Sequence, residues 1–234
     1  MLERIGRLGS VVSRDALTLL RWLAYAVRPV TLAELQTATT IRPEDDEVDF
    51  EDEGDFRDSL DILAGLVVFL DGANSTKDDG YTQYDRMSTE NGNLTPATRV
   101  RFAHFSVKEY LESARIVGSS ASFFRLEVGV CHRFLSQSRL TYLMSYSKSD
   151  DKISPKMDMD KFHLLSYAAE YWREHSVLQS GDDVSREVAL LECEDARFDL
   201  LRIETLERRC LDLMATPSVM YRAYIMRSTG VSRI

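Results

Sequence analysis

The sequence has few cysteines and prolines and no long hydrophobic run, the features that mark disulfide-rich, proline-rich and membrane-spanning proteins. Its 234 residues include three cysteines and five prolines, and its longest apolar run, residues 62–70, has nine residues. A membrane-spanning helix needs about 20 apolar residues, so we expect none in this chain. The first ten residues carry charges and no apolar stretch, which excludes a secretory signal there. Cys131, Cys193 and Cys210 are odd in number and far apart in apolar helical patterns, which indicates reduced thiols and a cytoplasmic location.

A surplus of basic residues is also missing. Lys and Arg number 29 against 38 Asp and Glu, a net charge of −9, and residues 44–55 hold nine of the acids and no base. The like charges of this segment repel one another, so we expect a solvated acidic loop. A strongly basic nucleic-acid-binding surface is disfavoured, because docking on phosphate needs an excess of Lys and Arg.

The familiar catalytic and metal-binding motifs are absent as well. The sequence contains no GxSxG, GxxxxGK[ST], HExxH or CxxC motif. Cys131 and His132 are neighbours, but adjacent helical side chains point about 100° apart, so we interpret them as a core thiol and a surface or capping imidazole. His163 and His175 have no acidic partner at ligand spacing and are interpreted as solvated or packing residues. We therefore expect no enzyme activity, no metal site and no cofactor bound by this chain alone.

What the sequence does contain is helical periodicity around one small β element. The patterns predict helices at 14–27, 31–39 and 55–64, then strands at 66–70 and 98–104 joined through a long loop, 71–98. This is the order of a winged-helix domain, which we predict for residues 1–117. Further helical patterns at 123–144, 160–175, 185–193 and 196–215 predict an antiparallel helical domain over residues 118–234. The expected fold class is mainly α, with a small two-stranded β-hairpin.

The second predicted helix has a complete start signal. Thr31 is the expected N-cap, Glu34 the capping-box partner that returns its hydrogen bond, and Val30 and Leu35 form a hydrophobic staple.

A similar signal follows the second strand. Ser106 is the expected N-cap of the next helix, with Glu109 as its capping-box partner and Phe105 stapled onto Tyr110. His104 lies two residues earlier, at the end of the strand, where the free N–H groups and positive dipole end of a helix bind phosphate oxygens. His104 is therefore a candidate ligand-binding residue, although its position alone favours the alternative, a structural imidazole satisfied by backbone groups.

A winged helix raises the question of DNA binding. Its third helix would enter the major groove, but here that helix begins with Asp55, Asp58 and Asp61 against the single base Arg57 and follows the acidic segment. Acids also outnumber bases in the loop 71–98. Since phosphate would be repelled where it must approach, we favour a winged helix used for packing against protein.

Four strings give the chain a family resemblance: RDALTLLRWLAYAVRPVTLAELQTA, LDILAGLVVFLDG, TRVRFAHFSVKEYLES and FHLLSYAAEYWREH. They resemble the segment that follows the NACHT nucleotide-binding domain in fungal NLR-like STAND proteins, a segment known as the "GPI inositol-deacylase winged helix domain" that often precedes ankyrin repeats. The most specific string is AHFSVKEYL together with the LAGLVVFLDG strand upstream. A deacylase would need the serine elbow that this sequence lacks.

The resemblance implies a regulatory role in a nucleotide switch. In related STAND proteins a winged-helix histidine contacts the β-phosphate of bound ADP, and His104 is the matching position, followed by Phe105 where the plant-type motif has Asp. Residues 1–5 resemble the end of the arm that leaves the nucleotide-binding domain, so we expect the phosphate loop upstream and ADP or ATP only in a full-length context. The expected function is a non-catalytic signal-relay segment that packs on the NACHT domain and couples its state to a sensor or ankyrin-repeat domain. The alternatives are a freestanding helical protein-interaction adaptor and, with less support, a DNA-binding regulator.

Overall fold

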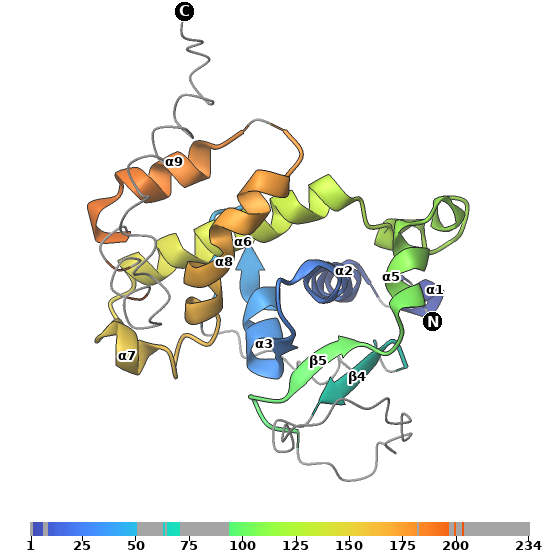
Figure 1. Ribbon diagram of the computed structural model, residues 1–234, viewed down its shortest axis with the longest axis horizontal. Coiled ribbons are helices and arrows are strands. Elements are labelled where there is room, and N and C mark those ends of the chain that lie inside the picture. Colours follow the sequence, from blue (N-terminus) through green and yellow to red (C-terminus); the bar gives the residue numbers. More distant parts are fainter. Residues whose placement is uncertain are drawn as a thin grey trace, which may run out of the picture. The chain divides into compact units, whose positions relative to one another are not determined.

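The chain is mainly helical, as predicted, with small antiparallel sheets (Figure 1). The computed structural model describes residues 2–6, 9–50, 63, 65–70, 94–181, 183–196, 199 and 203. It divides into two compact units. The N-terminal unit comprises Met1–Gln36 and Asp55–Phe124, and the C-terminal unit comprises Thr37–Gly54 and Arg125–Ile234.

The N-terminal unit is built around one buried helix. Helix α2 (Ser10–Tyr25) places Leu19, Leu20 and Trp22 out of contact with solvent. It begins at Ser10, earlier than the predicted residue 14. The short helix α1 (Leu2–Ile5) precedes it, and the Ser13 hydroxyl of α2 donates to the Ile5 carbonyl of α1 at 3.2 Å. The unit also contains α5 (Phe105–Glu112) and the 3₁₀ turns η1 (Ala114–Ile116) and η2 (Ser122–Phe124).

The sheet of this unit has three strands where the sequence predicted two. Strands β4 (Val67–Leu70) and β5 (Arg99–Phe102) form the expected antiparallel pair, and β1 (Val30–Thr31) joins the other edge of β5 in the order β1-β5-β4. The third strand was missed because two residues are too few to show a period of two. Gly65, just before β4, has a φ of 86°, the left-handed conformation expected there. The predicted helix 55–64, apart from Leu63, and the loop residues 71–93 lie outside the described residues.

Helix α3 (Leu32–Thr40) starts as the sequence predicted. The Glu34 N–H donates to the Thr31 hydroxyl at 3.2 Å, and the Thr31 N–H donates to the Glu34 carboxylate at 2.8 Å, so the reciprocal capping box is confirmed. Two further N–H groups of the first turn, those of Leu32 and Ala33, donate to carbonyls of residues 98 and 96. The start of α3 is therefore held by the side chains of Thr31 and Glu34 and by the backbone of the segment that leads into β5.

The C-terminal unit is an assembly of antiparallel helices. Figure 1 shows α8 (Leu165–Leu178) running alongside the long helix α6 (Val128–Lys148), with α9 (Ser185–Glu192) also packed on α6. The short helix α7 (Pro155–Asp158) lies between α6 and α8 in sequence. The predicted starts of α6 and α8, at residues 123 and 160, are too early, because loops with 3₁₀ and turn geometry occupy 122–124 and 159–164. Most of the helix predicted at 196–215 lies outside the described residues.

The acidic segment is only partly the solvated loop we predicted. Strands β2 (Ile41–Arg42) and β3 (Glu47–Val48) pair as a hairpin, with Asp46 at a φ of 55° in its turn. Arg186 from α9 binds the Asp46 carboxylate at 2.9 Å and the Pro43 carbonyl. An interaction partner from a distant helix therefore supplies the order that the acidic sequence cannot supply alone. The remaining residues, 51–55, lie outside the described part of the chain.

Candidate functional site

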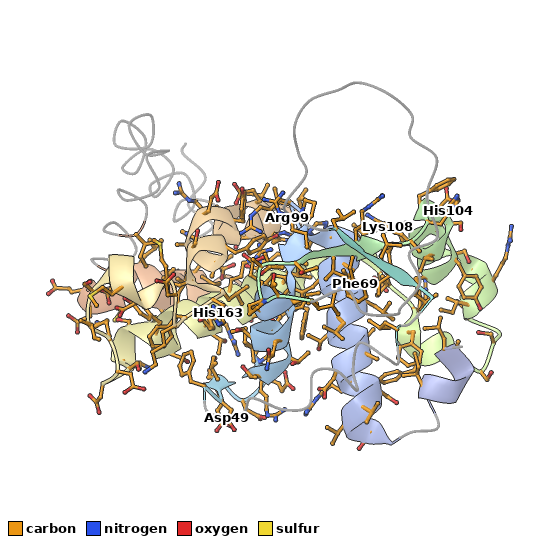
Figure 2. The ribbon with its side chains drawn as sticks, turned by 90° about the horizontal axis from the view of Figure 1, so that it is seen from below. Asp49, Phe69, Arg99, His104, Lys108 and His163 are labelled. Carbon is orange, nitrogen blue, oxygen red and sulfur yellow. The ribbon has the colours of Figure 1, made fainter. Side chains whose placement is uncertain are left out.

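His104 caps helix α5. Its backbone is extended (φ −149°, ψ 145°), and its ring Nδ1 accepts a hydrogen bond from the Ser106 N–H at 3.1 Å and lies 2.8 Å from the Ser106 hydroxyl. Figure 2 shows the ring where α5 begins, at the surface, and the residue is exposed. Phe105 packs against the imidazole, with ring centroids 4.3 Å apart.

This geometry corrects the predicted N-cap. Ser106 is not the cap, because the helix already includes Phe105 and the cap position falls on His104. The strand also ends at Phe102, so His104 does not share the buried strand face of Val100 and Phe102. Serine is a usual capping residue, but a cap needs only a side-chain acceptor within reach of the N–H of the second or third helical residue, and here the imidazole provides it.

The cap fixes which ring nitrogen of neutral His104 carries the proton. A backbone N–H can only donate, so Nδ1 must present its lone pair to the Ser106 N–H. The proton then sits on Nε2, which has no hydrogen-bond partner among the described residues. His104 thus offers an outward N–H donor beside a helix N-terminus, the chemistry that binds an anionic oxygen.

Helix α5 is held firmly against the end of α2. The Lys108 ammonium donates to the Ala24 carbonyl at 2.8 Å and lies 4.4 Å from the centre of the Tyr25 ring. The Tyr25 hydroxyl donates to the Glu112 carboxylate at 2.6 Å. These contacts satisfy a carbonyl at the C-terminal end of α2, and they connect α5, the helix that His104 caps, to the central helix of its unit.

Several apolar side chains near the cap in sequence are exposed. The sequence predicted a staple between Phe105 and Tyr110, but both side chains are substantially exposed. Val117 and Phe123 in the following turns are also exposed. Of these four residues, Phe105 is the one whose ring lies against the His104 imidazole.

The other three histidines of the sequence lie in the C-terminal unit. His163 is exposed, as the solvated interpretation requires. Cys131 is buried, as predicted, but the surface interpretation of His132 is wrong, because this residue is only 8% exposed. His132 and His175 meet in the interior with their Nδ1 atoms 2.7 Å apart. Burial, followed by the charges of Arg139 and His132, lowers the pKa of His175 to about 2.

The sequence analysis missed this histidine pair. The signal that could have found it is the spacing of His132, Ser136 and Arg139, which places three polar side chains along one face of α6. Which helix that face meets depends on tertiary packing, and 43 residues separate the two histidines. No group of three or more metal-binding side chains occurs in the described part of the chain. No helix described there is long and apolar enough to cross a membrane.

Comparisons with known proteins give one informative match. The chain is 29% identical over 165 residues to "Azaphilone pigments biosynthesis cluster protein L" from Monascus ruber. The match covers 70% of this chain and 31% of that relative, so the chain spans about a third of the relative's length. No family model matches the sequence. No solved structure matches it.

Proposed function

We propose that this chain is a non-catalytic regulatory segment of a NACHT-containing STAND protein, which relays the state of the nucleotide-binding domain to a sensor or repeat domain. The observation that carries this proposal is the outward Nε2–H donor of His104 at the start of α5. The length of the relative supports it, because the matching region there belongs to a much longer protein.

In this role the nucleotide is held mainly by the NACHT domain. One histidine and one helix N-terminus cannot replace a phosphate loop, so the chain's own residues supply a contact rather than the whole site. ADP bound by the NACHT domain would present its β-phosphate as the acceptor for His104. The imidazole keeps its cap through Nδ1 and donates through Nε2, so donating to phosphate would not disturb the start of α5.

The contacts of α5 give a route by which the contact would be relayed. Lys108 and Glu112 fasten α5 to Ala24 and Tyr25 of α2. A movement of His104 away from the phosphate would therefore carry α2, the core helix, along with it as one body. The exposed apolar residues near the cap in sequence supply a surface on which the NACHT domain would pack.

The test uses the full-length protein and separates capping from phosphate binding. Asparagine is a favoured N-cap residue, so His104→Asn keeps a cap acceptor, while its shorter amide no longer places a donor at the position of the imidazole Nε2. His104→Ala removes both the acceptor and the donor. We expect both variants to copurify with at least about fivefold less ADP, since losing a hydrogen bond to a charged group costs about 1.5–3 kcal/mol. His163→Asn is the control, because His163 is exposed and belongs to the C-terminal unit. Unchanged ADP content in both His104 variants would contradict the proposal.

A freestanding adaptor is the second candidate, and the exposed Phe105, Val117 and Phe123 favour it. The mass of the native protein separates the two candidates. An immunoblot of source-cell lysate that shows a band far above 26.7 kDa, with phosphate-loop peptides in the same band, supports the switch segment. A band at 26.7 kDa supports the adaptor and makes pull-down of its partner the next experiment.

A further inference from the structure

The interface between α6 and α8 has polar side chains buried in pairs along its length. His132 faces His175, and Ser136 faces Ser176 with their hydroxyl oxygens 2.7 Å apart. Arg139 is fully buried and donates to the Tyr171 carbonyl at 2.8 Å and to the Tyr167 hydroxyl at 3.2 Å. We call these paired residues of α6 and α8 the polar seam.

The histidine pair has room for one proton between its two Nδ1 atoms. At 2.7 Å, one Nδ1 must donate and the other must accept, so protonating both would set two N–H groups against each other. Protonation of the other ring nitrogen of His175 is also unfavourable, because its Nε2 is buried and has no hydrogen-bond partner in the described part of the chain. The permanent charge of Arg139 further opposes a second positive charge nearby.

The surrounding elements do little to offset a positive charge on the histidine pair. From α9, the buried Glu187 carboxylate accepts from Gln179 at 3.1 Å and lies 3.5 Å from the Ser136 hydroxyl. Arg133 of α6 pairs instead with the exposed Asp183. The other ionisable groups on these packed elements are Cys131, Tyr142, Tyr146 and Lys148 of α6, Tyr167, Glu170, Tyr171, Arg173 and Glu174 of α8, Arg186 and Glu192 of α9, and, in and beside the β2–β3 hairpin, Arg42, Glu44, Asp45, Asp46, Glu47 and Asp49. Those of the hairpin are solvent-exposed apart from Arg42, which is half-buried.

We infer that the polar seam is an acid-sensitive contact: below about pH 6, α6 and α8 open more often, while the opening of the core of the N-terminal unit does not change. The sign follows from linkage. The folded pKa of His175 lies far below its ordinary value of 6.5, so the opened form takes up a proton that the closed form refuses. The closed form is therefore favoured fully above pH 6.5 and progressively less as the pH falls below it.

The expected size of the effect is set by the protons gained on opening. For His175, which is neutral when closed and has an ordinary pKa when open, the opening equilibrium rises about tenfold between pH 7.5 and 5.5. Ordinary carboxylates titrate below this window, so histidine dominates within it.

Hydrogen exchange of the full chain tests the inference. Protection factors, which correct for the intrinsic pH dependence of exchange, are compared at pH 7.5 and 5.5 for peptides from α6, α8 and α2. We expect α6 and α8 to lose about tenfold in protection and α2 to change by less than about twofold. Equal loss in all three helices, or no loss in α6 and α8, would overturn the acid-sensitive contact.

Variants assign the effect to the pair. The double variant His132→Phe, His175→Phe keeps two aromatic rings and removes the titratable nitrogens, so the pH response of α6 and α8 should disappear, while His163→Asn should keep it. If the double variant does not fold, imidazole NMR of the unmodified protein decides the matter. The His175 ring signal should keep its neutral position until α6 loses protection. A His175 ring signal that titrates near pH 6.5 while protection is retained would overturn the inference.

Discussion

The two units bury their interiors by different means. Helix α2 of the N-terminal unit contributes Leu19, Leu20 and Trp22, all fully buried and bound by non-directional apolar contacts. The main helix pair of the C-terminal unit also buries apolar residues, among them Leu135, Leu140 and Ala168, but adds to them the polar seam, whose contacts depend on distance, angle and protonation. An apolar core tolerates a change in pH, and a polar seam specifies one register of its helices and is sensitive to conditions.

Each unit contains a tryptophan whose fluorescence can report the unfolding of that unit. It has two tryptophans, Trp22 in the N-terminal unit and Trp172 in the C-terminal unit, and both are buried. The variants Trp172→Phe and Trp22→Phe therefore isolate the fluorescence of one unit each. Urea unfolding in these two backgrounds measures the stability of each unit separately.

The largest effect is expected from the apolar core. Leu20→Ala should lower the free energy of unfolding of the N-terminal unit by about 3 kcal/mol, because it deletes buried methyl groups and leaves a cavity. The measurement follows Trp22 in the Trp172→Phe background. Val11→Ala on the same helix is the control, since Val11 is 59% exposed, and should change stability by less than about 0.5 kcal/mol. Equal effects of the two variants would show that α2 is not the core helix.

A smaller loss is expected from the polar seam. Arg139→Ala should destabilise the C-terminal unit by about 2 kcal/mol, because it removes the donor to the buried Tyr171 carbonyl and the contact with the Tyr167 ring. Arg139→Met should cost less, since it fills the space without burying a charge. Both are followed through Trp172 in the Trp22→Phe background. An Arg139→Ala variant as stable as the parent would contradict a stabilising role for the seam.

The smallest of these effects is expected at a helix start. Thr31→Ala removes the hydroxyl that accepts from the Glu34 N–H and should cost about 1 kcal/mol. Thr31→Ser keeps the hydroxyl and should stay within about 0.5 kcal/mol of the parent. Urea unfolding followed through Trp22 makes the comparison. Identical losses in the two variants would point to packing of the threonine methyl rather than capping.

Two helix starts with the same sequence signature show how far prediction reached. Thr31 and Glu34 form the predicted capping box, whereas the Ser106 signal is displaced and His104 takes the cap. In the first case the residue before the helix is drawn into strand β1, which fixes where the helix begins. In the second, β5 ends at Phe102 and leaves an extended residue free to cap, which no local pattern reveals.

The candidate site shows the same division. Position alone identified His104 as the residue at the mouth of a helix, but the identity of its donor nitrogen required the contact between Nδ1 and the Ser106 N–H. The histidine pair escaped prediction altogether, because its members lie on different helices and each resembles an ordinary packing residue in sequence. The acidic segment likewise needed Arg186, more than a hundred residues away, to become a hairpin.

The sequence by itself determined the helical class of this protein, the β4–β5 pair, the buried helix α2 and the start of α3. The helices and strands follow from periodicity, the start of α3 follows from hydrogen bonds between residues three positions apart, and the β4–β5 pair follows from two neighbouring strand patterns in the order of a hairpin. Only the tertiary structure decided the third strand, the imidazole cap, the acidic hairpin and the polar seam. Each of these depends on a polar group meeting a partner far along the chain or on where a neighbouring element ends, and burial makes that meeting energetically necessary without recording it in the local sequence.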